Sequence, residues 1–444
     1  MSATLTSPPL PSRPAARFAA AGRSAAPGLL DRWLSTQATN LLRHVASLRR
    51  FTVEEFGKGP EAPSEAHVEA ANKFIDRYKD KLVDAARGVD AAVKIARREP
   101  TGARLQLVLD RKDAVGQRIL YVEGIWAFFF DLFVQRKSTF GERLRAVDRI
   151  AANCYEDLYV GMGAAQPTPR LLPVSYVQSG LGPMTYRRGV PITKLRRQAN
   201  PFPLVYIPQH RLENVWALSS VLHEVSHNLQ ADIGLWERIP RDLFGRLIRE
   251  GGLSEAVASI WARWHKEIMA DLLALVFGGP GAVESLMDVV GRSRANTVRF
   301  SPLGVHPTPY LRTFINTLLL RRLGLARLAD EIDAAWRRLY PQVSGEDIPR
   351  EIAATFTRAA ELVIDTMIFQ PYAELAGKSV ARIVTFGPAQ MEMIAQGGRL
   401  LAEGKDAVGT PARFMIGAAR YAFDRRLAAP EQITANFYRT LGRR

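Results

Sequence analysis

Residues 223 to 227 read His-Glu-Val-Ser-His inside a stretch whose apolar residues recur at helical spacing. On a helix, residues four apart share one face, so His223 and His227 can present two imidazole nitrogens to one metal ion, with Glu224 beside them. The alternative interpretation is a helix with two histidines that are ordinary surface or core residues. Because a match to this pattern is rare by chance in a histidine-poor chain, we expect a metal-binding helix here.

The bounds of this helix are predicted from its flanking residues. Leu204–Ile207 is a β-branched and aromatic run that Pro208 closes, which indicates a short strand. We expect the helix to begin near Leu212 or Glu213 and to end at Gly234, because glycine suits the left-handed position after a helix. The stripe along it is expected to hold Trp216, Ser220, His223 and His227.

A second helix is predicted from about Ser254, a good N-terminal cap, to Phe277, where Gly-Gly-Pro follows. Glu267 and Asp271 are four apart on it and interrupt a largely apolar face. Buried carboxylates are normally paired or bound to metal. Glu267 is therefore the candidate third metal ligand, and Asp271 is the candidate acceptor for the second ring N–H of a ligating histidine.

Two alternatives stay open on this second helix. Its two carboxylates can instead form a solvated face, with Arg263 and Lys266 as ion-pair partners. His265 is a rival metal ligand, although it lies two residues from Glu267 and so points elsewhere on the helix.

Further along, His306-Pro307 is followed by Arg312, six positions after the histidine. Together with His223–His227 and with Glu-Ile-Met-Ala-Asp at Glu267–Asp271, in this order, residues 200–315 resemble the gluzincin peptidases of the HtpX and CAAX prenyl endopeptidase superfamily. Ser226 departs from the pattern, since that family more often has glycine there. Many members are membrane-embedded, whereas the apolar stretches of this chain are too short to span a bilayer.

The resemblance implies a zinc endopeptidase with one Zn²⁺ per chain, bound by His223, His227 and Glu267. Zinc lowers the pKa of water toward neutrality, and Glu224 would take the proton of that water and pass it to the leaving amine. His306 would lie near the open face of the zinc, where it could hydrogen-bond a tetrahedral intermediate; the alternative is a surface histidine in a Pro-rich turn.

Two residues after His306 have weaker expected roles. Tyr310 is a further candidate donor to an oxyanion. Arg312 is expected to form an ion pair that ties its helix to the helix of the His-Glu motif. A peptide or protein is the expected substrate, and it could add as a strand to a sheet edge formed by Leu171–Tyr176 or by Leu204–Ile207.

The remaining chain predicts a mostly α (α+β) fold: a zincin-like core with a small mixed sheet between N- and C-terminal helical regions. The expected regions are a disordered basic tail at 1–28, helices at 29–164, the core at 165–320 and helices at 321–444. Helices are expected at 29–50, 65–98, 118–135, 311–340, 348–375, 380–402 and 411–441.

Composition limits the compartment and leaves another class of function open. The single Cys154 excludes an intrachain disulfide framework, which is compatible with the cytoplasm; an organellar transit peptide is the alternative for the acid-free first 28 residues. The net charge of +16 also fits a basic helical protein that binds nucleic acid or another protein, with a structural or inactive metal site. The basic residues are spread along the chain, which favours compositional bias, but a cluster from Arg187 to Arg197 lies near the expected substrate rim.

Overall fold

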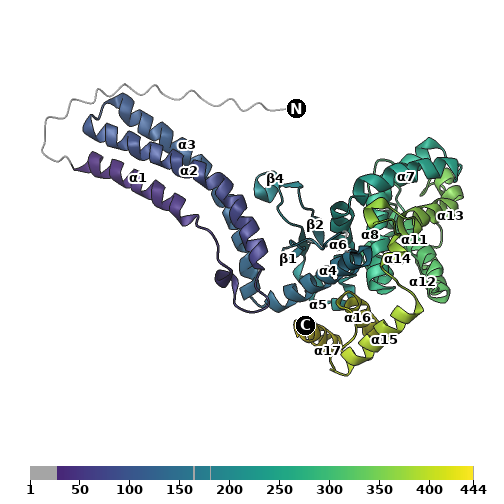
Figure 1. Cartoon of the computed structure of the whole chain (residues 1–444). Coiled ribbons are helices and arrows are strands. Elements are labelled where there is room, and N and C mark those ends of the chain that lie inside the picture. The colour runs from purple at the N-terminus through teal and green to yellow at the C-terminus, as the bar shows by residue number, and fades with distance from the viewer. Residues whose placement is uncertain (1–27, 164–165, 181, 444) are drawn as a thin grey trace, which may run out of the picture. The chain divides into compact units, whose positions relative to one another are not determined.

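The computed structural model describes residues 28–163, 166–180 and 182–443 (Figure 1). The predicted fold class is confirmed: the protein is mostly helical, and its described residues contain one three-stranded mixed sheet and one two-stranded sheet. Apart from Gly28, the expected basic tail lies outside the described residues. Within them, no helix combines the length and the apolar character that crossing a bilayer requires.

The described residues divide into two units. The smaller contains the residues up to Leu48 together with Lys79–Leu120, and the larger contains Arg49–Tyr78 together with the residues from Tyr121 onward. The sequence-based division at residues 164 and 320 stays a prediction.

Three helices supply the smaller unit: α1 (Leu29–Ser47), the second part of α2 (Glu65–Arg98) and the first part of α3 (Gly102–Val134). Each turns an apolar stripe inward, for example Leu41 of α1 and Val89 of α2, both buried. At the surface, Asp31 accepts two hydrogen bonds from Arg97, at 2.5 and 2.9 Å. The helix predicted at 118–135 is α3, which begins at Gly102, well before residue 118.

The larger unit contains the mixed sheet, in the order β1 (Val174–Val177), β5 (Leu204–Ile207), β2 (Met184–Tyr186). β1 pairs with β5 in parallel and β2 pairs with it antiparallel. A second, two-stranded sheet joins β3 (Pro191–Ile192) to β4 (Gln198–Ala199). The prediction that Leu204–Ile207 could be a sheet edge is wrong, because β5 is the central strand and is buried along its whole length. This burial explains why the run is apolar at every position.

The other candidate edge, β1, has its outer side occupied by side chains. Gln135 Oε1 accepts the N–H of Val177 at 2.7 Å, and Gln135 Nε2 donates to the Val177 carbonyl at 3.1 Å. Asp148 accepts the N–H of Ser175, also at 2.7 Å. A peptide could add to β1 only by displacing these three bonds. At β2, the other outer strand, the Thr185 N–H donates to Glu224, so a peptide would displace that bond there.

The motif helix α6 (Ser219–Asp232) begins later than predicted. The short helix α5 (Gln209–Glu213) ends at Asn214, whose φ of −109° and ψ of 70° are not helical, and a 3₁₀ turn follows at Val215–Ala217. Trp216 is consequently not on the stripe of His223 and His227; its ring stacks on Phe423 at 4.1 Å between centroids. The predicted end of α6 is correct, with Gly234 at φ 79°.

The second predicted helix, α8 (Glu255–Gly278), agrees closely with expectation, and Ser254 caps it by accepting the N–H of Val257. α6 packs along α8, and Gln230 of α6 donates to the Lys266 carbonyl of α8 at 3.1 Å. At Gly278 the helices are so close that a Cβ would lie 2.3 Å from Leu222 Cδ1. This close packing brings the two predicted motifs together.

Further helices surround this pair and complete the buried core of the larger unit (Figure 1). They are α4 (Gly141–Met162), α7 (Leu235–Arg249), α9 (Gly281–Val290), α10 (Arg294–Thr297), α11 (Pro309–Arg322), α12 (Ala326–Leu339), α13 (Arg350–Ile364), α14 (Val380–Ile383), α15 (Pro388–Ala402), α16 (Met415–Asp424) and α17 (Pro430–Gly442). The single helices predicted at 311–340 and 411–441 are each two helices, separated at Gly324 and near Pro430.

Candidate metal centre

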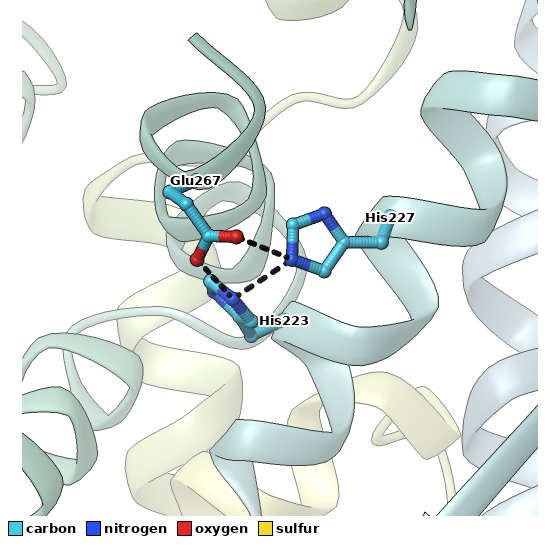
Figure 2. A group of neighbouring side chains, drawn as sticks. All are labelled: His223, His227 and Glu267. Atoms are coloured by element: carbon cyan, nitrogen blue, oxygen red, sulfur yellow. Dashed lines mark hydrogen bonds and ion pairs between the residues drawn. The ribbon is translucent and has the colours of Figure 1, made fainter. Parts of the chain in front are cut away.

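Three side chains from α6 and α8 converge on one point (Figure 2). His223 Nε2 lies 3.1 Å from His227 Nε2 and 3.3 Å from Glu267 Oε2. His227 Nε2 lies 3.5 Å from Glu267 Oε1. The helical spacing in α6 places both imidazoles on the face that contacts α8, and Glu267 reaches them from that helix.

The three residues fit a divalent metal ion. One ligand atom from each lies within 4.8 Å of the others, so one ion can contact all three. Two imidazoles and one carboxylate form a donor set typical of zinc sites that keep a position open. Among the described residues, no fourth histidine, cysteine or carboxylate joins this group.

Asp271 and Arg312 hold the His223 ring in place on the side away from His227 Nε2: Asp271 contacts His223, and Arg312 contacts Asp271. His223 Nδ1 donates to Asp271 Oδ1 at 2.8 Å, which leaves Nε2 directed at the metal position. Arg312 donates from Nε and Nη2 to the two oxygens of Asp271, at 2.7 and 2.8 Å. The predicted partner of Arg312 was the motif helix, and this is wrong: the ion pair ties α11 to α8. His227 Nδ1 differs from its counterpart, because it is buried without a partner among the described residues.

The alternatives for α8 can now be judged. Asp271 is only 6% exposed, so the interpretation of its carboxylate as part of a solvated face is wrong. His265 makes its contacts away from the cluster, with Nδ1 2.6 Å from the Ala262 carbonyl and Nε2 3.1 Å from the Trp236 carbonyl. Ser226, the departure from the family pattern, is buried and donates to the Leu222 carbonyl at 2.7 Å, which satisfies its hydroxyl within α6.

The charges of the cluster call for a cation. Burial alone would lower the pKa of His223, but its hydrogen bonds to Asp271 and Glu267 raise that pKa to about 10. Burial would raise the pKa of Glu267, yet the hydrogen bond with His223 and the nearby positive charges hold it well below its usual range. Burial and the neighbouring His223 lower the pKa of His227 to about 3. A proton on His223 thus supplies positive charge at the place where a metal ion would supply it.

The pKa of Glu224 is shifted in the opposite direction from that of Glu267, the carboxylate of the three-residue cluster. Burial raises the pKa of Glu224 to about 7, while the Thr185 backbone N–H donates a hydrogen bond to it. A carboxylate with such a pKa can accept a proton at neutral pH and release it again. Glu224 lines the same cavity as His223, His227 and Glu267.

His306 and Tyr310 end in different surroundings. The His306 side chain is 62% exposed and its Nε2 lies 3.4 Å from Glu267 Oε1, so it lies at the rim of the cluster. The Tyr310 ring packs against Phe314 and Trp336, with centroids 5.0 and 6.5 Å away. Tyr310 does not line the cavity that contains the cluster, so the structure does not bring it to a position where it could contact an oxyanion there.

The cavity beside the cluster has a volume of about 580 Å³; sequence reasoning had placed Arg187 near the substrate rim but had missed the other residues described next. One wall is β2, where the Thr185 hydroxyl accepts a hydrogen bond from Asn228 of α6 at 2.6 Å. At the end of α6, Trp236 and Arg187 also line it. The three-residue strand β2 lies among glycines and prolines, so alternation of apolar and polar residues gave no signal for it.

No protein-family model, no curated protein and no solved structure matches this chain.

Proposed function

We propose that this protein is a zinc metallopeptidase that cleaves peptide bonds within a chain. The observation that carries the proposal is the convergence of His223, His227 and Glu267 on one point, with Glu224 in the same cavity. The resemblance of residues 200–315 to gluzincin peptidases, which rests on the same residues and their order in the sequence, agrees with this geometry.

Zinc is the metal that the donors favour. Magnesium and calcium prefer oxygen ligands, whereas two neutral imidazoles with one carboxylate suit zinc. Bound there, zinc would supply Lewis acidity, which polarises a carbonyl and makes water acidic enough to attack it near neutral pH.

The chain's own residues have separate tasks in this proposal. Glu224 accepts the proton of the attacking water and donates it to the nitrogen of the leaving amine. Asp271 fixes the tautomer of His223 and, held by Arg312, keeps its ring in place. His306, exposed at the rim, donates a hydrogen bond to the oxygen that becomes negative during attack.

The substrate binds along β2 in this proposal. β2 has β5 on one side only, and it forms a wall of the cavity that contains the cluster. An extended peptide can therefore extend the sheet at β2 and lie across the metal position. A backbone recognised in this way favours peptides over small esters or amides.

Metal analysis and one active-site variant test the proposal. Purified protein should contain about one zinc per chain, and a His223→Ala, His227→Ala double variant should contain none. Glu224→Gln should keep both the fold and the zinc but lose hydrolysis of a quenched-fluorescence peptide library by at least about 100-fold. Undiminished zinc in the double variant, or undiminished hydrolysis in Glu224→Gln, would contradict it.

A further inference from the structure

Two cations lie against one aromatic ring beside the cavity: Arg187 and Trp236 line the cavity, and Lys266 contacts the Trp236 ring from outside the lining. Trp236, in the first turn of α7, has the Arg187 guanidinium carbon 3.6 Å and the Lys266 Nζ 4.2 Å from its ring centroid. The ring centroid of Trp236 also lies 6.0 Å from that of His227. Arg187 follows β2 directly and Lys266 precedes Glu267 in α8, so the pair adjoins both the strand edge and the metal ligands.

These cations lack a carboxylate partner at contact distance. Among the described residues, neither Arg187 nor Lys266 enters an ion pair, although the exposed Glu237 acts on both from further away. Arg188, the next residue, contrasts with them: it donates to the Leu171 carbonyl at 2.7 Å and faces Asp232 at 3.5 Å. Two positive charges held on one ring repel each other, so an anion that contacts both would make the arrangement more favourable.

The opposite end of the cavity has another chemistry. α6 runs along the cavity from Ser220 in its first turn to the end near Trp236. Near Ser220 the lining consists of small or uncharged side chains, including Ala282, Ser285 and Leu286 of α9. Among the described lining residues, Arg187 is the arginine without a carboxylate partner at contact distance, because Arg312 is paired with Asp271.

We propose that Arg187 and Lys266, held on Trp236, bind an acidic side chain of the substrate on the N-terminal side of the cleaved bond. The direction of the bound peptide follows from that of β2, whose chain runs from Met184 toward Arg187. Antiparallel pairing is the more stable, and a peptide paired in this way has its N-terminal part beside Arg187. This inference rests on the proposed peptidase function, and it names the substrate class: peptides with Asp or Glu before the scissile bond.

Charge reversal tests the assignment. The substrates are pairs of peptides, one pair for each of the four positions before the cleaved bond. The two peptides of a pair differ only in having Glu or Gln at that position. Wild-type protein should prefer Glu at one of these positions by roughly 10-fold in kcat/KM, as expected for a charge-assisted hydrogen bond. Arg187→Glu and Lys266→Glu should each remove this preference, and the double variant should favour Lys.

Controls separate a local from a general effect. Arg327→Glu makes the same change in net charge at a side chain that is 95% exposed on α12, and it should keep the preference. The milder variants Arg187→Gln and Lys266→Gln replace any reversal variant that loses its helical circular dichroism or its zinc. Cleavage without a preference for Glu, or a preference that survives in both reversal variants, would overturn the inference while the peptidase proposal stands.

A binding measurement keeps the inference testable if nothing is cleaved. Zinc-loaded Glu224→Gln protein is titrated with the same Glu and Gln peptides by calorimetry. Tighter binding of the Glu peptide, lost when Arg187→Glu is added, supports the acidic subsite even if hydrolysis by the wild type is absent. Equal affinities for the two peptides reject the subsite.

Discussion

Two buried arginine–aspartate pairs in this protein look alike and differ in their balance of charge. In one, Arg136 donates to Asp148 and to the Ser175 carbonyl, and Asp148 also accepts from the Ser175 N–H and hydroxyl at 2.7 and 2.6 Å. One positive and one negative charge meet there. In the other, Arg312 pairs with Asp271, but Glu267 and Glu224 are buried beside them.

The difference separates a structural ion pair from a binding site. The pair at Arg136 joins the end of α3 to α4 and β1, and its charges cancel within the protein. The cluster at Arg312 has more carboxylates than arginines, so a proton on His223 or a bound cation has to balance it, because burying uncompensated charge is strongly unfavourable. A divalent cation bound by His223, His227 and Glu267 would supply that charge. Removing residues from the two places should therefore affect different properties.

The largest expected effect is the loss of metal on Glu267→Ala. This change removes one of three ligands, so zinc affinity should fall by at least about 1,000-fold, beyond the range for partners that only orient a ligand. Competition with a fluorescent zinc chelator measures the affinity. Asp148→Ala is the matched control, because it removes a half-buried carboxylate from the balanced pair and should leave zinc affinity unchanged. Tight zinc in Glu267→Ala would move the third ligand elsewhere.

Arg136→Ala should give the opposite result, a loss of stability without a loss of metal. Removing one partner of a buried pair leaves the other without compensation, which costs about 3 kcal/mol of unfolding free energy, at the lower end because the Asp148 side chain is 29% exposed. Urea denaturation of the zinc-loaded protein measures it. Arg327→Ala, in an exposed pair on α12, should leave the midpoint unchanged. An Arg136→Ala protein that also loses zinc would remove the distinction between the two pairs.

The cluster was largely predictable from sequence, because helices fix which residues share a face. His223 and His227 are one turn apart, as are Glu267 and Asp271, and the Ser254 cap and the glycines at the end bounded α8 correctly. Only the meeting of the two helices had to be inferred. The two helices pack closely at Gly278, a tertiary contact that local patterns do not reveal.

The errors came where tertiary contacts override local preference. Asn214 interrupts the helical pattern, and Trp216 stacks on Phe423 of α16 instead of lying on the face of α6. Tyr310 turns toward Trp336 on the next helix, a contact that its own neighbours in sequence do not indicate. The roles of β5 and β2 in the sheet depend on strand order, and hydrophobicity alone favoured the central strand as the candidate.

Asp271→Asn should have an intermediate effect on the cluster. The amide still fits beside His223 and Arg312, but it removes the negative charge that receives the His223 N–H and balances the guanidinium. Zinc affinity should fall about 10- to 100-fold, as found when partners of metal-bound histidines are replaced. Asp148→Asn provides the comparison with the balanced pair and should not change zinc affinity. Equal zinc affinity in Asp271→Asn and wild type would leave Asp271 only a packing role.

The smallest expected effect comes from Ser254→Ala, far along α8 from the carboxylates. Its hydroxyl accepts the Val257 N–H at 3.4 Å, and losing such a cap costs about 1 kcal/mol of unfolding free energy. Ser254→Asp should retain the cap and the stability. Zinc affinity should stay unchanged in both, because Glu267 lies more than three turns away and is held by packing against α6. If Ser254→Ala also weakened zinc binding, the geometry of the cluster would depend on the whole of α8. Stability and metal binding could then not be separated, contrary to the comparison of the two ion pairs.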